Sequence, residues 1–288
     1  MPFPSEPRPR DRADAPGLSA RAAAGGGAVL ALDGSPIAVR DMAAPGESGW
    51  KRTGFWQALR RLRGRARKLR RKLPKRPSRR HANPYATHLP VLIGVAAIVR
   101  PKAFLEYGSG VISTPTLLDR SMFPDLESVV SLENDAEWLD RVAAATDDAR
   151  LELRLVDGSV RRAVAAAEVN AADMVLIDDS RAVEDRAATI EAVLDSLDPA
   201  VPTTILVHDA ETPEYLSLLR SKTARGGSLE GAHLFVFDAF EPHTGCLSTD
   251  PRCTPSRLRA LNRRIARQTA TTQPDDLAAW ADLLINRD

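Results

Sequence analysis

The chain has 288 residues, enough for one large domain or two small ones, and its 40 Lys and Arg nearly balance its 38 Asp and Glu. The charge is unevenly distributed: residues 51–80 hold fifteen Lys and Arg and no acidic residue, and subtracting them from the net +2 leaves −13 elsewhere. Two cysteines, Cys246 and Cys253, are too few for a disulfide scaffold. The longest apolar run, Leu89–Val99, is too short to span a bilayer, and no signal-peptide pattern is visible. These features favour a cytoplasmic protein.

The first 84 residues are expected to stay outside the folded core. Residues 1–50 are rich in Pro, Gly, Ala, Arg and Asp without a sustained apolar period, which predicts a disordered leader. Residues 51–84 are predicted to form a basic amphipathic segment or a linker, because apolar side chains recur at helical spacing at Phe55, Leu59, Leu62, Ala66, Leu69 and Leu73. Residues 51–80 could bind an anionic membrane surface, which would place the protein peripherally at a membrane, or nucleic acid; a solvated linker is the alternative.

Between residues 85 and 250, short apolar runs alternate with helical patterns, which predicts an α/β domain with a doubly wound, mostly parallel sheet. The predicted strands are 103–106, 128–132, 151–156, 173–177, 203–207 and 233–237, with a short seventh at 246–249. The seventh would form an antiparallel hairpin with the sixth through the turn at 241–245. Residues 251–288 are predicted to add two helices packed on this domain, near 256–268 and 275–286.

The most informative stretch is residues 104–110, a buried strand that runs into the turn Gly108-Ser109-Gly110 and should open a helix near Thr114. Glycines at such a turn let the backbone approach a ligand closely. A dinucleotide-binding pattern would carry a third glycine where this chain has Ser113. Beyond the second predicted strand, Glu133 stands where a carboxylate could accept hydrogen bonds from both hydroxyls of a ribose.

These motifs resemble the class I S-adenosylmethionine-dependent methyltransferases. The resemblance also includes Asp157-Gly158 after the third predicted strand, Asp178 after the fourth and His208-Asp209 after the fifth, and it covers about 165 residues in the family's order. It implies a Rossmann-like, seven-stranded fold with an antiparallel last strand, and S-adenosylmethionine as the cofactor.

The resemblance also implies a set of cofactor-binding residues. Glu106 and the backbone of Tyr107, Gly108, Ser109 and Gly110 would line the methionine part, Glu133 with its neighbour Asn134 the ribose, and Asp157 with Gly158 the adenine edge. Asp157 could instead cap the helix that follows it.

Within the family, the residues after the fourth and fifth strands are most similar to the catechol-type O-methyltransferases. By that similarity Asp178 and Asp209 would bind Mg²⁺, whose preferred ligands are hard oxygens. The chain departs from the pattern at Ala210, where a further ligand is usual, and at Arg181, where a lysine base is common. His208 is then the candidate base, unless strand alternation turns it away from a site that Asp209 faces. The predicted catalytic residues are Asp178, His208 and Asp209.

The expected reaction is methyl transfer to an oxygen of a small-molecule or natural-product-like acceptor, with nitrogen and carbon acceptors and the oligomeric state left open. One alternative is an NAD(P)-dependent oxidoreductase, although no tyrosine-lysine or similar hydride-transfer pair is found. The other is a non-catalytic Rossmann-like binding protein that acts through its basic leader.

Overall fold

The computed structural model describes residues 83–285, so the expectations for the leader and for the basic segment at 51–80 lie outside the described residues. The chain divides after Lys72, and every described residue belongs to the second unit, residues 73–288. No helix in this described part has both the length and the hydrophobicity needed to cross a bilayer.

A seven-stranded sheet in the order β3-β2-β1-β4-β5-β7-β6 forms the centre of the fold. The first five strands pair in parallel, whereas β7 lies antiparallel between β5 and β6. The strands are β1 (Ala103–Tyr107), β2 (Ser128–Glu133), β3 (Leu151–Leu155), β4 (Met174–Ile177), β5 (Thr204–His208), β6 (His233–Phe237) and β7 (Thr244–Ser248). The predicted fold class is therefore confirmed, including the antiparallel last strand, which begins two residues earlier than expected.

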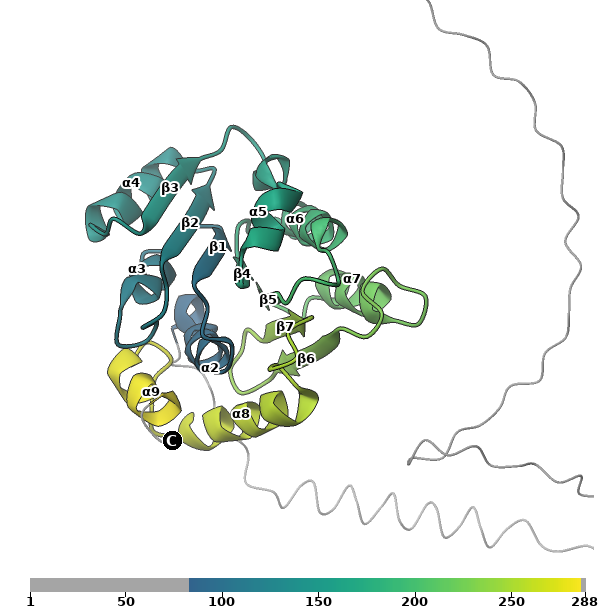
Figure 1. Cartoon of the computed structure of the whole chain (residues 1–288). Coiled ribbons are helices and arrows are strands. Elements are labelled where there is room, and N and C mark those ends of the chain that lie inside the picture. Colours follow the sequence, from purple (N-terminus) through teal and green to yellow (C-terminus); the bar gives the residue numbers. More distant parts are fainter. Residues whose placement is uncertain (1–82, 286–288) are drawn as a thin grey trace, which may run out of the picture. The chain divides into compact units, whose positions relative to one another are not determined.

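Helices cover both faces of the sheet (Figure 1). One face carries α2 (Leu89–Val99), α3 (Ser113–Leu118), α8 (Pro255–Gln268) and α9 (Leu277–Leu284), and the other carries α5 (Ala166–Ala171), α6 (Val183–Ser196) and α7 (Pro213–Thr223). Helix α4 (Ala136–Ala145) lies beside β2 and β3, and two short 3₁₀ helices span Pro84–Ala86 and Val160–Ala163. The two predicted C-terminal helices are present and pack on α2.

The two faces explain why the central strands read as continuous apolar runs. Alternate residues of β4 enter different cores: Met174 and Leu176 face α2 and α8, whereas Val175 and Ile177 face α5 and α6. On the first face α2 and α8 approach closely, since a Cβ placed on Gly94 would lie 2.5 Å from Leu261 Cδ1.

This topology gathers the carboxyl ends of β1, β2, β4 and β5 at one edge of the sheet. The chain leaves β1 toward β2 and β3 and then returns to β4 on the other side of β1, so the strand order reverses between β1 and β4. Ligands of doubly wound sheets bind outside the carboxyl ends at such a reversal.

Candidate functional site

The glycine turn after β1 packs directly against the backbone that follows β4. Gly108 has a φ of 91°, and a Cβ at this position would clash with the carbonyl oxygen of Asp178 and the Cα of Asp179. Only glycine combines this left-handed backbone with so close an approach. At Gly110 an added Cβ would clash with the hydroxyl of Ser113. Gly108 therefore lets the ends of β1 and β4 meet, and Gly110 lets the turn approach the start of α3.

The carboxylate of Glu106 lies beneath this turn and is fully buried. It accepts hydrogen bonds from Ser113 Oγ and Thr114 Oγ1, both at 2.7 Å, and from Ser131 Oγ at 2.6 Å. Burial raises the pKa of Glu106 to about 7, although these three hydrogen bonds oppose the shift. The carboxylate of Glu106 thus holds the turn and the start of α3, and its predicted place at the methionine part of the cofactor stays a prediction.

A cavity of about 740 Å³ opens at the carboxyl edge of the sheet. Its walls come from residues 108–113 after β1, residues 133–135 after β2 and residues 178–181 after β4, together with Trp138 and Arg141 of α4. The volume lies in the range of small-molecule sites. The predicted residues Gly108, Ser109, Gly110, Glu133, Asn134 and Asp178 thus line a single cavity.

Three other predicted cofactor residues do not line this cavity. Tyr107 buries its ring in the core that faces α6, and its carbonyl oxygen accepts a sheet hydrogen bond from Asp178 N at 2.8 Å. Asp157 and Gly158 are exposed after β3. Asn134 Nδ2 donates to the carbonyl oxygen of Gly158 at 2.9 Å, which ties the turns after β2 and β3 together. The adenine contact of Asp157 stays a prediction.

Glu133 is held rigidly at the cavity. Its side chain accepts hydrogen bonds from the backbone N–H of Asn134 at 2.8 Å and of Asp135 at 3.1 Å, and from Ser109 Oγ at 3.4 Å. Burial raises the pKa of Glu133, with these hydrogen bonds acting against the shift. Trp138 Nε1 donates to the carbonyl oxygen of Ser109 at 2.6 Å and fastens α4 to the glycine turn.

Arg186 of α6 occupies the position predicted for a metal ion. Its Nη2 lies 2.8 Å from Asp178 Oδ1, its Nη1 lies 2.6 Å from Asp209 Oδ2, and its side chain is only 6% exposed. The guanidinium group supplies the positive charge that two neighbouring carboxylates require. Asp178 and Asp209 are thus committed to Arg186, and the residues present do not fit the Mg²⁺ ion that the sequence suggested.

The other oxygen of Asp178 faces His208. His208 Nδ1 lies 3.1 Å from Asp178 Oδ2, and Nε2 lies 2.9 Å from Thr87 Oγ1. Burial alone would raise the pKa of Asp178, but the charges of His208 and Arg186 lower it to about 2. For His208, burial is outweighed by Asp178, which raises the pKa of the imidazole. Because both ring nitrogens are hydrogen-bonded and the ring does not line the cavity, His208 is placed to orient Asp178.

The backbone conformation of Asp209 explains how both His208 and Asp209 reach the same cluster. Strand β5 ends at His208, and Asp209 adopts a φ of 57°, which is uncommon for a residue other than glycine. The alternation breaks at this residue, so His208 bonds one oxygen of Asp178 while Asp209 bonds the Arg186 group that holds the other. His208 and Asp209, which were both predicted for the site, therefore both reach the cluster, and the alternative in which strand alternation turns His208 away does not hold.

His88, just before α2, lines the cavity and was missed by the sequence analysis. The residue is 2% exposed, neither ring nitrogen has a hydrogen-bond partner among residues 83–285, and the ring stands edge-on to His208 with a centroid distance of 4.8 Å. Burial, followed by the charge of His208, lowers the pKa of His88 to about 3, so its imidazole is neutral at pH 7. Ligand atoms of His88, Asp178 and His208 lie within 4.8 Å of one another, but hydrogen bonds already engage the last two.

Arg186 was also missed, although the sequence contains a signal for it. Thr189, Ile190 and Val193 follow Arg186 by three, four and seven positions, which places all four on one face of α6, and all four are buried. A charged residue within a buried helical stripe requires partners of opposite charge. The carboxylates after β4 and β5 were the available partners.

Comparisons with solved structures concern the fold. An O-methyltransferase family protein from Burkholderia thailandensis is 12% identical to this chain, with a TM-score of 0.39. The match covers 56% of this chain and 55% of that protein, so this chain spans about half the length of that protein. Human methyltransferase-like protein 13, in complex with SAH, is 14% identical with a TM-score of 0.41, covering 65% and 92%. A spermidine synthase is 13% identical with a TM-score of 0.41, covering 71% and 76%.

No protein-family model matches the chain, and no curated protein matches it in sequence. The strand order, the antiparallel β7 and the glycine turn at the carboxyl edge are those of the class I methyltransferase fold, as the resemblance implied. The fold alone does not identify the group that is transferred.

Proposed function

We propose that this chain is an S-adenosylmethionine-dependent methyltransferase acting on a hydroxyl oxygen of a small-molecule acceptor. The observation that carries the proposal is that the glycine turn, the Glu133 carboxylate and Asp178 line one cavity at the reversal of strand order. When bound there, S-adenosylmethionine would supply an activated methyl group.

The residues present fit this cofactor. Gly108 and Gly110 line the cavity and carry no side chain, so their backbone can approach a ligand closely. Glu133 is fixed by two backbone N–H groups and keeps its carboxylate at the cavity, where it can accept hydrogen bonds from ribose hydroxyls. A nicotinamide oxidoreductase is less well supported, since the antiparallel β7 between β5 and β6 departs from the parallel order of dinucleotide-binding sheets.

His88 is proposed to bind the acceptor. A buried imidazole without a partner costs folding free energy, and this cost is recovered if a group in the cavity supplies the missing hydrogen bond. A neutral imidazole accepts a hydrogen bond from a hydroxyl group and so can orient the oxygen lone pair toward the methyl carbon. Arg181, which also lines the cavity and stays charged, would favour an acceptor that carries an anionic group.

The cofactor is tested first, by calorimetric titration of the full chain with S-adenosylmethionine and separately with NADH. We expect micromolar binding of S-adenosylmethionine and no binding of NADH. Because Arg186 holds both carboxylates, a chelator or added Mg²⁺ should leave the affinity unchanged. Binding of NADH alone would favour the oxidoreductase, and binding of neither would remove the proposed function.

Two substitutions separate the cofactor from the chemistry. Gly110→Arg should abolish binding of S-adenosylmethionine, because the side chain displaces Ser113 and fills the turn; unchanged affinity would disprove the assignment of the cavity. Asp178→Asn should keep the cofactor affinity within a few-fold and lower methyl transfer to a panel of hydroxyl acceptors by roughly 100-fold, since Asp178 orients the cluster beside the acceptor.

A further inference from the structure

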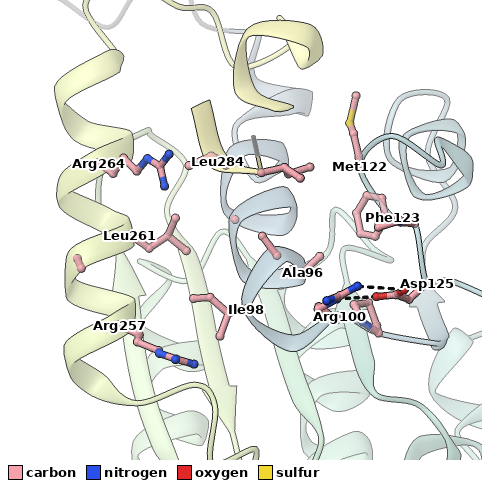
Figure 2. Close-up of a pocket in the computed structure, with 16 residues that line it drawn as sticks. Ala96, Ile98, Arg100, Met122, Phe123, Asp125, Arg257, Leu261, Arg264 and Leu284 are labelled. Carbon is pink, nitrogen blue, oxygen red and sulfur yellow. Dashed lines mark hydrogen bonds and ion pairs between the residues drawn. The ribbon is translucent and has the colours of Figure 1, made fainter. Parts of the chain in front are cut away.

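A second cavity, of about 640 Å³, lies at the opposite, amino-terminal edge of the sheet. It is bounded by the end of α2 and the residues just before β1, by the turn at residues 122–125, and by α8 and α9. Figure 2 shows Ala96 and Ile98 of α2 on one side of this space, Met122 and Phe123 on another, and the α8 side chains opposite. The proposed methyl-transfer chemistry uses none of these residues.

The α8 wall combines one apolar side chain with two cationic ones. Arg257, Leu261 and Arg264 follow at spacings of four and three, which places them on one face of the helix, and all three line the cavity. Leu261 is buried against α2, whereas Arg257 is exposed and Arg264 half-buried. The wall therefore offers positive charge at both ends of an apolar patch.

Within residues 83–285, no acidic side chain pairs with either of these arginines. Arg257 Nη1 donates to the carbonyl oxygen of Arg252 at 3.3 Å, and Arg264 makes no ion pair in this part of the chain. The third arginine at the cavity differs, since Arg100 Nε lies 2.7 Å from Asp125 Oδ2. Helix α8 carries five arginines and no acidic residue. Two cations at an apolar cavity are thus available to an anion.

We propose that this cavity binds an anionic amphiphile, with its acyl or alkyl chain against Leu261, Ile98 and Phe123 and its carboxylate or phosphate on Arg257 or Arg264. The walls are mainly aliphatic, so they suit a hydrocarbon chain better than stacked nucleobases, which require aromatic platforms. The cavity volume lies within the range of small-molecule sites. The source of the amphiphile is either a free monomer or a membrane lipid.

The test is a calorimetric titration of the full chain with decyl phosphate below its critical micelle concentration, with uncharged decyl glucoside as the matched ligand. We expect decyl phosphate to bind at least about tenfold more tightly. The double substitution Arg257→Gln and Arg264→Gln should weaken the binding of decyl phosphate about tenfold. The matched control is Arg259→Gln with Arg263→Gln, which removes the same charge from exposed positions of α8 outside the cavity. The control should alter the affinity less than about twofold. Ala97→Phe, which fills the cavity, should abolish binding of both ligands.

A second arm uses vesicles containing phosphatidylglycerol. Loss of vesicle binding in the Arg257→Gln, Arg264→Gln variant, but not in the Arg259→Gln, Arg263→Gln control, would identify a membrane lipid as the source. Binding of the monomer alone would identify a free amphiphile. Equal effects of the two double substitutions in both arms would overturn the proposal, as would the absence of binding in both. Thermal unfolding of each variant establishes that it folds.

Discussion

The two edges of the sheet use arginine in opposite ways. At the carboxyl edge, the side chain of Arg186 is 6% exposed and pairs with Asp178 and Asp209, so these carboxylates neutralise its positive charge. At the amino edge, Arg257 and Arg264 have no acidic partner among the described residues and remain accessible. A buried cation needs an anionic partner because it has lost its hydration, whereas an accessible cation is stabilised by water until a ligand binds. Arg186 therefore organises a site by pairing with carboxylates, whereas Arg257 and Arg264 can bind an anionic ligand.

The strongest test of this difference removes the charge at each edge. Arg186→Met should lower the free energy of unfolding by about 3 kcal/mol, because it leaves partly buried carboxylates without their cation. Arg264→Met, the matched change at the amino edge, should alter it by less than about 0.5 kcal/mol. Urea denaturation of both variants measures these values. A loss of similar size in both would contradict the distinction.

A second test uses pH, because the carboxyl edge buries a neutral imidazole. The folded-state pKa of His88 is lowered from 6.5 to about 3, so at pH 5 the unfolded chain binds a proton that the folded protein does not. Above about pH 6.5 His88 is neutral in both states and the difference has no effect, whereas it progressively lowers the free energy of unfolding as the pH falls from 6.5 toward 3. At pH 5 the loss is about 2 kcal/mol.

His88→Leu should therefore make the stability less sensitive to acid between pH 7 and pH 5, as urea denaturation at the two pH values would measure. At pH 7 the variant should be at least as stable as the unaltered protein, since it removes a buried polar group without a partner. It should also impair methyl transfer while leaving the affinity for S-adenosylmethionine within a few-fold. An unchanged acid sensitivity would mean that His88 is protonated in the folded protein.

The smallest expected difference is in the response to salt. Raising the ionic strength from 50 to 500 mM should change the stability difference between the unaltered protein and Arg186→Met by less than about 0.5 kcal/mol, because buried pairs are weakly screened. Binding of decyl phosphate should weaken about threefold over the same range, since Arg257 is exposed. Strong salt dependence of the first quantity would place the Arg186 cluster in contact with bulk water.

Local sequence patterns were sufficient to predict the sheet. The strand at 233–237 was predicted with both bounds correct, and the helix at Leu89–Val99 follows the apolar run residue by residue. Helix α2 is almost entirely buried and the edge strand β6 is half-buried, and both are apolar runs whose composition distinguishes them from the surrounding loops. The end of β5 was harder, because the left-handed backbone at Asp209 interrupts the alternation on which the prediction for His208 depended.

The glycine turn and Glu133 were predicted for the cavity, but the charged cluster was only half foreseen. Asp178 and Asp209 follow strands and could be found by position, whereas Arg186 lies in the middle of a helix and His88 comes before the domain's first strand. Arg186 binds Asp178 and Asp209, which lie 8 and 23 positions away, and His88 packs on His208, 120 positions away. The buried helical stripe marks Arg186 as needing a partner but does not identify these partners. The Mg²⁺ ion was implied by the similarity to the catechol-type O-methyltransferases, and Arg186 was not considered as the counter-charge of Asp178 and Asp209.

Helix α2 and its N-cap residue His88 together connect the two cavities. His88 at its start lines the carboxyl-edge cavity, while Ala96 and Ile98, about 12–15 Å further along the axis, line the amino-edge cavity. A substitution in α2 that shifts the helix would disturb both binding sites at once, so an effect measured at one cannot be assigned without measuring the other. Helices α4 and α8 each line only one of the two cavities, and variants in them report on the two sites independently.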